Sequence, residues 1–454
     1  GIHMTTMEKF QAGIERFLVP IAAKLNSQRH ICAVRDSFIL SFPLTMAGSL
    51  MVLLNFVFLS PDGFVAKLLK LESIIPNFAE YQNIFSPVLR GSADILAIFI
   101  VFLVARNLAK TLKADDLLTG LTAVSVYFII YPDYVGVDNV NHLTTKFLGS
   151  QGLFVAIIVG LVVGELMAIL SKSEKLEIKM PEQVPPAVAR SFKVLIPIIL
   201  ITLSFSIINF LIKKVAPGGL HEWVYAVIQS PLTKLGQNVG SVIVLAFICQ
   251  ILWAMGIHGP NTIAAVRDTM FAEAVNSNVL YAAQHGTAWG APFPVTFNGL
   301  FDAFGAYGGS GATLGLVIAL ILFSKAKDQK SIAKLSLAPG IFNINEMVIF
   351  GLPIILNPIY IIPFVLAPIV NIIIGYSATC IFKIIPPVAY GVPWTTPGPL
   401  IPFLGTGGNV LALLIGVLCL AVSVLIYAPF VIAAGKASQV DDDNSEKDTT
   451  EGLA

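Results

Sequence analysis

The sequence predicts an all-α protein that spans a membrane many times. Of its 454 residues, 56% are hydrophobic and only 12% are charged, and the mean hydropathy is +0.82. Soluble domains are about 25% charged. A helix needs roughly 20 apolar residues to cross a hydrocarbon core of about 30 Å, and runs near this length recur along the chain. We therefore predict a polytopic membrane protein with about ten transmembrane helices and re-entrant hairpins.

The predicted crossings are apolar runs separated by short polar loops. They are 37–59, 93–109, 117–132, 152–170, 192–213, 239–257, 311–324, 360–382 and 409–434. The stretch 347–357 is apolar but too short to cross. Together with the broken region 285–308, it suggests re-entrant or discontinuous segments.

The ends of the chain and the basic loops predict the orientation. Residues 1–4, Gly-Ile-His-Met, resemble a tag-cleavage remnant, and 5–36 is an amphipathic segment expected along the inner membrane surface. Lys and Arg near span ends mark cytoplasmic loops, so we expect both termini inside. These residues are Lys24, Arg29, Arg35, Arg106, Lys110, Lys113, Lys172, Lys175, Lys179, Arg190, Lys193, Lys325, Lys327, Lys330 and Lys334.

The two halves of the chain differ in composition and in the continuity of their apolar runs. Residues 37–215 hold uninterrupted apolar runs and are predicted to form a scaffold with an oligomer interface. Residues 216–436 are rich in Gly, Pro, Asn and aromatic residues and are predicted to handle the substrate, because broken helices at membrane depth line wet cavities. The loop 171–191 would connect them, and 437–454 is an acidic tail expected to be disordered.

Several classes of function are disfavoured. The net charge of +1 gives no basic surplus for nucleic acid, and the four cysteines have no metal-ligand spacing. The glycines at 308–311 lack the GK[ST] of a phosphate loop and are interpreted as a turn. No cofactor or metal is predicted. No compact soluble domain is present, so any soluble catalytic partner would be a separate chain.

Polar residues gather in four clusters of the second half. "WAMGIHGPN" holds a histidine at a break in an apolar run, and "NGLFDAFGAYGGSG" holds an aspartate before a glycine-rich turn. "FNINE" and "VPWTTPG" follow later in the chain. The candidate site residues are Trp253, His258, Asn261, Asn298, Asp302, Asn345, Glu346 and Trp394.

Each candidate also has a structural explanation. His258 could cap a helix, Asp302 could pair with a lysine or cap a helix, and the tryptophans could lie at the membrane interface. Glu346 is the hardest to explain structurally, because it has no basic neighbour in sequence and a carboxylate is costly to insert in a membrane. Carboxylates, imidazole, amides and indoles without a cationic cluster suit a neutral polyhydroxyl ligand.

The motifs resemble one transporter family. "GIHG", "GGSGATLGL", "APGIFNINEMVIFGLPIILNPIYIIPF", "IIPP" and "VPWTTPG" are similar to the membrane-embedded IIC component of the phosphoenolpyruvate-dependent sugar phosphotransferase system. The branch is the lactose, cellobiose and diacetylchitobiose family. The resemblance covers the chain after its first four residues.

The resemblance implies a reaction and an assembly. It implies a homodimer in a bacterial plasma membrane, with an elevator-type movement of the substrate domain. The 6-hydroxyl of a β-linked disaccharide would be phosphorylated by a cysteine phosphate on a separate IIB protein, supplied through IIA, HPr and enzyme I. No phosphoryl-carrying residue is expected in this chain.

The same resemblance assigns roles to four residues. The essential His and Glu of the family match His258 and Glu346, its Asp before the glycine turn matches Asp302, and its late Trp matches Trp394. Asn261 and Asn298 are added on chemical grounds alone. Glu346 would act as a base on the reacting hydroxyl, and His258 would orient that network.

Two other functions remain open. In a proton-coupled secondary sugar transporter, Glu346 and His258 would relay protons. A lipid-linked glycosyltransferase would need a metal-binding carboxylate pair, and no DxD or DxxD occurs near the proposed site.

Overall fold

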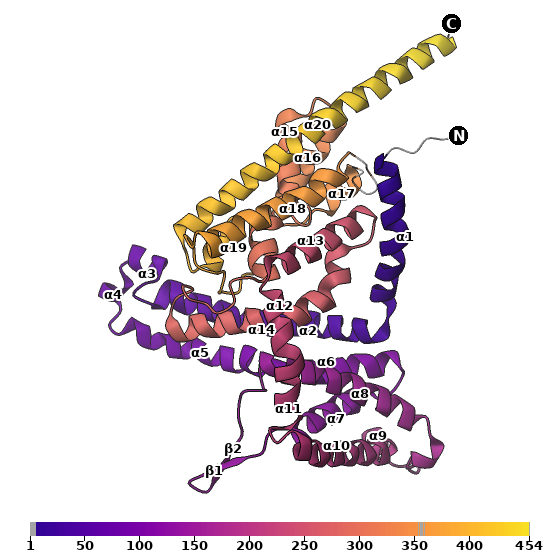
Figure 1. Ribbon diagram of the computed structural model, residues 1–454, viewed down its shortest axis with the longest axis vertical. Coiled ribbons are helices and arrows are strands. Elements are labelled where there is room, and N and C mark those ends of the chain that lie inside the picture. Colours follow the sequence, from indigo (N-terminus) through magenta and orange to yellow (C-terminus); the bar gives the residue numbers. More distant parts are fainter. Residues whose placement is uncertain (1–5, 353, 355–356, 358, 454) are drawn as a thin grey trace.

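The computed structural model describes residues 6–352, 354, 357 and 359–453 (Figure 1). The predicted tag remnant at 1–4 lies outside these residues. Helices α6–α10 gather at one end of the molecule and α15–α20 at the other, while α2, α13 and α14 lie between them (Figure 1).

The first half of the chain is mostly helical. Its α-helices are α1 (Thr6–Ser27), α2 (Arg29–Leu59), α3 (Phe64–Leu68), α4 (Leu71–Ile74), α5 (Gln82–Arg90), α6 (Leu96–Thr111), α7 (Asp116–Ile129), α8 (Leu153–Ser171), α9 (Pro186–Lys193) and α10 (Leu195–Val215). Short 3₁₀ turns are η1 (Phe78–Tyr81), η2 (Ala93–Ile95), η3 (Ser150–Gly152) and η4 (Glu174–Leu176).

The second half contains more interruptions. Its α-helices are α11 (Gly219–Val224), α12 (Ser230–Gly236), α13 (Val239–Ala254), α14 (Gly259–His285), α15 (Thr313–Phe323), α16 (Lys327–Ile341), α17 (Glu346–Gly351), α18 (Ile361–Tyr376), α19 (Leu400–Gly405) and α20 (Val410–Leu453). Three π-helical segments are η5 (Tyr225–Gln229), η6 (Asn298–Gly305) and η7 (Ser377–Ile381).

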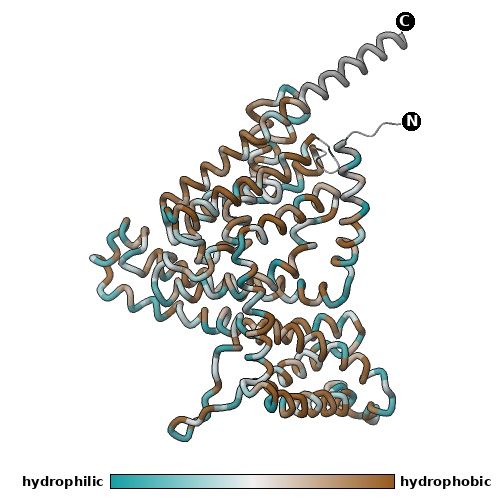
Figure 2. Tube along the Cα trace, in the orientation of Figure 1, coloured by the Kyte–Doolittle hydropathy of each residue, from teal (hydrophilic) through white to brown (hydrophobic). Residues whose placement is uncertain are grey.

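The number of crossings predicted from sequence is not settled by helix length. Among the described residues, six helical segments are long and apolar enough to span a membrane, or seven if a bent pair counts as one span. That pair, Gly219–Gly236 with Val239–Ala254, is bent by 78°. The predicted runs 117–132 and 311–324 form only the shorter apolar helices α7 and α15. Figure 2 shows hydrophobic residues predominating in α10 and α18, whereas α1 and α14 are mixed.

One feature differs from the sequence-based expectations. The loop after α7 forms an exposed antiparallel hairpin, β1 (Val135–Val137) with β2 (Val140–His142), so a small sheet accompanies the helices. Its two turn residues, Asp138 and Asn139, have φ of 52° and 62°, which Asp and Asn tolerate and which match the twist of a two-residue hairpin. The expected disorder of the acidic segment 437–454 stays a prediction.

The first-half core forms where α6 packs on α8. Buried residues recur on α6 at helical spacing, including Ile100, Val104 and Leu108. Gly160 and Gly164 of α8 face Val104 and Leu108, so the absence of side chains on α8 lets the two backbones approach closely.

Helix α14 joins the two halves through its polar side chains. Thr262 accepts a hydrogen bond of 2.9 Å from Asn26 of α1, and Asn276 donates to the Ala93 carbonyl at 3.2 Å. Between them, the buried Glu273 accepts bonds from Tyr225, Gln229 and Thr233 at 2.6, 3.2 and 2.8 Å. Gln229 in turn donates to the Ser150 carbonyl at 2.6 Å, so these bonds fix α14 against elements from both sides of residue 215.

Candidate functional site

The break between α13 and α14 exposes an imidazole at a helix start. Gly256 has φ of 89°, which favours glycine because a Cβ is strained there. A Cβ on Gly259 would lie 2.0 Å from the Cys249 carbonyl oxygen, so only glycine fits. Between them, His258 is the N-cap of α14, and its Nδ1 accepts from the Asn261 backbone N–H at 3.1 Å. The "GIHG" motif therefore ends one helix and starts the next within four residues.

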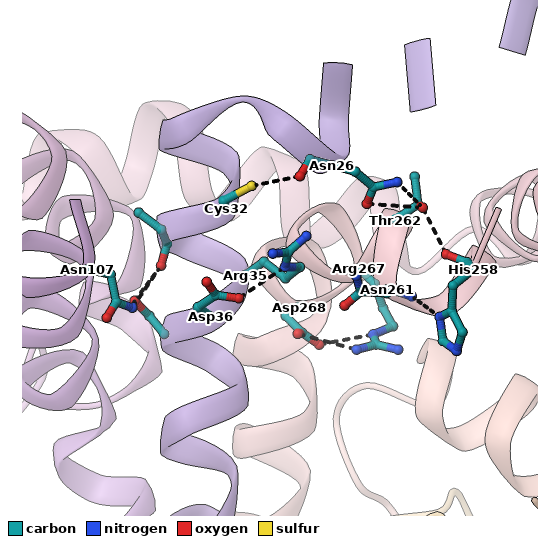
Figure 3. Close-up of polar contacts among 12 residues, drawn as sticks. Asn26, Cys32, Arg35, Asp36, Asn107, His258, Asn261, Thr262, Arg267 and Asp268 are labelled. Carbon is teal, nitrogen blue, oxygen red and sulfur yellow. Dashed lines mark hydrogen bonds and ion pairs between the residues drawn. The ribbon is translucent and has the colours of Figure 1, made fainter. Parts of the chain in front are cut away.

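The turn is also fixed from outside. Thr262 donates to the His258 carbonyl at 2.8 Å and accepts from Asn26 at 2.9 Å, which connects the turn to α1 (Figure 3). His258 thus caps a helix, which is the structural explanation that the sequence left open for it. Capping uses Nδ1 and leaves Nε2 of the exposed ring available to a ligand.

Glu346 lies in α17, whose Phe350 ring packs 6.2 Å from the ring of Trp253, and Trp253 in turn packs 4.9 Å from the ring of His258. It is the first residue of α17, where a carboxylate faces the positive end of the helix dipole. Both side chains are exposed rather than packed in the core. The contacts of Trp253 therefore place α17 beside the turn that holds His258, although His258 and Glu346 are 88 residues apart in sequence (346 − 258).

Two asparagines connect three of the four polar clusters. Asn343 donates to the carbonyls of Trp394 and Thr396 at 2.5 and 2.8 Å, and its Oδ1 accepts from the Gly308 N–H at 2.9 Å. Asn345 donates to the Ser310 carbonyl at 2.9 Å. We call these four contacts the asparagine clamp. The clamp holds the glycine turn and the late loop against the start of α17, next to Glu346.

The backbone of the glycine turn allows the two asparagines to approach it closely. Gly308, Gly309 and Gly311 have φ of 89°, 114° and 86°, and a Cβ on Gly309 would lie 2.6 Å from the Asn345 amide nitrogen. Asn343 itself has φ of 66°, a left-handed conformation that asparagine adopts more readily than most residues. These residue types therefore follow from the backbone geometry.

The two tryptophans differ in their exposure. Trp394 is 52% exposed, so its ring can cover an apolar ligand face. Trp253 is only 5% exposed and packs between His258 and Phe350, with ring centroids 4.9 and 6.2 Å away. Trp253 therefore has little free surface for a ligand, and it supports the ring of His258 instead.

The remaining predicted residues are Asp302, Asn261 and Asn298. Asp302, in η6, is partly buried and lies within electrostatic range of Arg267 and Asp268 of α14. Arg267 and Asp268 form an ion pair of 3.0 Å with each other. The side chains of Asn261 and Asn298 are exposed and make no hydrogen bond within the described part of the chain.

Sequence reasoning missed the role of Asn343 and the network around Glu273. Asn343 was visible inside "FNINE", and an asparagine beside glycines and prolines is a recognisable signal for a left-handed backbone position. Glu273 had no such signal, because its partners lie 40 to 48 residues earlier in the chain.

Comparison with known proteins gives a consistent result. The family model "Phosphotransferase system, EIIC" matches residues 35–368. The chain is 33% identical to the cellobiose-specific EIIC component of Lactococcus lactis, over 96% of this chain and 100% of that protein. It is also 33% identical to the oligo-beta-mannoside-specific EIIC component of Bacillus subtilis, over 93% of each.

A solved structure agrees in fold. The crystal structure of the transporter ChbC, the IIC component of an N,N'-diacetylchitobiose-specific phosphotransferase system, superposes with a TM-score of 0.86. The two chains are 31% identical, and the match covers 95% of this chain and 99% of ChbC. The chain belongs to the EIIC family of the phosphotransferase system.

Proposed function

We propose that this protein binds a β-linked disaccharide and carries it across the bacterial plasma membrane while a separate phospho-IIB protein phosphorylates it. The observation that carries the proposal is the packing of α17, which begins with Glu346, beside the His258 turn through Phe350 and Trp253, together with a clamped loop and an exposed Trp394. Cellobiose, oligo-beta-mannosides and diacetylchitobiose, for which its relatives are named, are β-linked sugars of this kind.

The proposed chemistry is a phosphoryl transfer from sulfur to oxygen. The sugar 6-hydroxyl oxygen attacks the phosphorus of the cysteine phosphate on IIB, the P–S bond breaks, and the cysteine leaves as a thiolate. Glu346 accepts the hydroxyl proton. His258 bonds a neighbouring hydroxyl through Nε2 and so orients the sugar. Such transfers depend mainly on positioning and electrostatics, which the asparagine clamp supports by holding the walls of the site.

The other site residues have supporting roles in the proposal. Trp394 covers the apolar face of one sugar ring. Asp302, Asn345, Asn298, Asn261 and Trp253 complete or support the polar wall. After transfer, the sugar phosphate carries about two negative charges and is repelled by Glu346, which favours its release.

We also propose how the chain is arranged in the membrane. Both termini face the cytoplasm, residues 37–215 supply the interface of a homodimer, and 216–436 move against them as an elevator. The exposure of α10 supports the proposed dimer interface, because only 17% of its most apolar stretch is buried within one chain.

Sugar binding to purified protein tests the site. Cellobiose, lactose and diacetylchitobiose are titrated into wild type, Glu346→Gln and His258→Ala, with Glu174→Gln in an exposed loop turn as the matched control. We expect one sugar to bind wild type and the control alike and to lose at least about tenfold in affinity in both site variants. Unchanged binding in both would remove Glu346 and His258 from the site.

Coupling is tested in cells that carry IIA and IIB. We expect the sugar to accumulate as its phosphate and accumulation to stop when IIB is deleted. Accumulation of free sugar that follows the pH gradient without IIB would instead establish the proton-coupled alternative.

A further inference from the structure

Two cavities lie side by side between α2 and α6, away from the sugar site. One has a volume of about 500 Å³ and a mixed wall whose polar residues are Asp36, Arg106, Asn107, Lys110 and Thr111. The other has a volume of about 340 Å³ and an apolar wall that includes Leu44, Phe99, Phe102 and Leu103. Volumes of this size accommodate small molecules.

The cavities form one amphipathic cleft, because Leu40 lines both of them. The polar cavity joins early residues of α2 to late residues of α6, whereas the apolar cavity joins later residues of α2 to earlier residues of α6. The helices are therefore antiparallel, and the polar mouth lies at one end of the pair. Both helices belong to candidate membrane spans, so the apolar part of the cleft runs along the bilayer.

The mouth has an excess of available positive charge. Lys110 is exposed and has no ion-pair partner within the described residues. Arg106 contacts Asp116 only at 3.9 Å. Asp36, the one carboxylate of the lining, already has Arg35 as a partner at 3.1 Å (Figure 3).

The wall between the helices is rigid. Asn107 donates to Ser37 at 3.1 Å and to the Ala33 carbonyl at 3.4 Å, which fixes α6 to α2 beside the mouth (Figure 3). Because Asn107 is held in this way, Arg106 and Lys110 project from a fixed backbone one helical turn apart.

We propose that this cleft binds one anionic phospholipid, with its phosphate between Arg106 and Lys110 and one acyl chain along Leu40, Leu44 and Phe102. Basic pockets between transmembrane helices bind anionic headgroups, and here such a pocket opens directly into an apolar groove. The exposed Lys110 favours a lipid headgroup over a second copy of the chain, because a protein surface over it would have to desolvate the ammonium group or supply a carboxylate to pair with it.

Lipid retention measured by native mass spectrometry tests the proposal. Purified wild type in a neutral detergent is mixed with phosphatidylglycerol or with phosphatidylcholine of the same acyl chains. The variants are Lys110→Gln, Arg106→Gln/Lys110→Gln and the groove-filling Leu40→Trp. The matched control is Lys172→Gln/Lys175→Gln, which removes two exposed cations outside the cleft. A parallel mixture contains glycerol 1-phosphate in place of lipid.

We expect wild type and the control to retain one phosphatidylglycerol at least tenfold more strongly than phosphatidylcholine. The double cleft variant loses this preference, and Leu40→Trp weakens retention of the lipid. Lys110→Gln, an exposed substitution that leaves the bonds of Arg106 and Asn107 intact, gives a partial loss even if the double variant folds poorly.

Three results would overturn the proposal. Equal retention of both lipids in every variant would show ordinary lipid solvation. Displacement of phosphatidylglycerol by glycerol 1-phosphate at equal concentration would show a phosphate site without a lipid groove. A change from dimer to monomer in Leu40→Trp, with lipid retention unchanged, would assign the groove to a second copy.

Discussion

Glycine serves different purposes in the two halves of this protein. In the first half, Gly160 and Gly164 lie where a Cβ would come 2.8 and 2.9 Å from the side chains of Val104 and Leu108. They allow two straight helices to pack closely. In the second half, Gly256 and Gly308 have positive φ and let the backbone turn at membrane depth.

The comparison separates stability from function. A close helix pair can absorb a small added group by moving a side chain, at the expense of packing. A turn that carries a predicted site residue cannot absorb an added group in this way, because the atoms next to its glycine belong to the backbone. Substitutions of the first kind should change the stability of the protein, and those of the second kind should change the site.

The largest effect is expected for Gly259→Ala. Its Cβ would lie 2.0 Å from the Cys249 carbonyl oxygen, so the turn that holds His258 must shift. A displacement of about 1 Å can reduce a rate about 100-fold, and we expect a loss of that order in IIB-dependent sugar phosphorylation. The control is Gly435→Ala, where a Cβ meets no atom within 4 Å. Near-wild-type activity in Gly259→Ala would mean that the position of His258 does not matter.

A smaller effect is expected when the asparagine clamp is broken. Asn343→Gly removes three hydrogen bonds, but glycine adopts the backbone φ of 66° without strain. At about 1 kcal/mol for each net bond, we expect sugar affinity to fall at least tenfold in a binding titration. Asn343→Ala should lower the sugar affinity further, because alanine is strained in the left-handed region by about 1–2 kcal/mol. If Asn343→Gly binds sugar like wild type, the late loop is positioned by other contacts.

The sequence was most informative where the physics is local. Long apolar runs predicted the spans around α2, α8, α10 and α20, because hydropathy decides which helices enter a bilayer. The costly polar residues of the second half predicted a site around His258 and Glu346, and this assignment stays a prediction. Helix α14 was not among the predicted crossings, because many of its residues are polar and bond to partners on both sides.

Contacts between distant residues could not be predicted. The clamp from Asn343 to Trp394 spans 51 residues, and the bond from Asn26 to Thr262 spans 236. No spacing rule covers such separations, since tertiary packing decides them. The residue types were recognisable, but their partners were not.

In the first half, Gly164→Ala should lower stability without changing the site. The added Cβ would meet the Leu108 side chain at 2.9 Å, and overpacking of this kind costs about 1–3 kcal/mol. We expect a lower Tm in detergent and an unchanged Kd for sugar. A weaker Kd at unchanged Tm would show that the α6–α8 pair communicates with the site, and the separation between the halves would then fail.

The smallest effect is expected at the loop between the halves. Arg190 of α9 forms a two-pronged ion pair with Asp115, the residue that caps α7. Burial opposes ionisation of Asp115, but the bonds from Arg190 and the Leu118 N–H outweigh it and hold the pKa of Asp115 below its ordinary 3.8. Because Arg190 is exposed to solvent, which screens the ion pair, Arg190→Gln should lower the Tm only slightly.

The pH dependence identifies this contribution. A carboxylate with a lowered pKa in the folded state stabilises that state above its ordinary pKa, and the contribution is lost as the pH falls through the lowered value. The Tm difference between wild type and Arg190→Gln should therefore be constant from about pH 8 to 5 and shrink below about pH 4. A difference that shrinks between pH 8 and 6 would implicate a histidine instead. A change in sugar Kd at neutral pH would show that the loop transmits the position of the first half to the site.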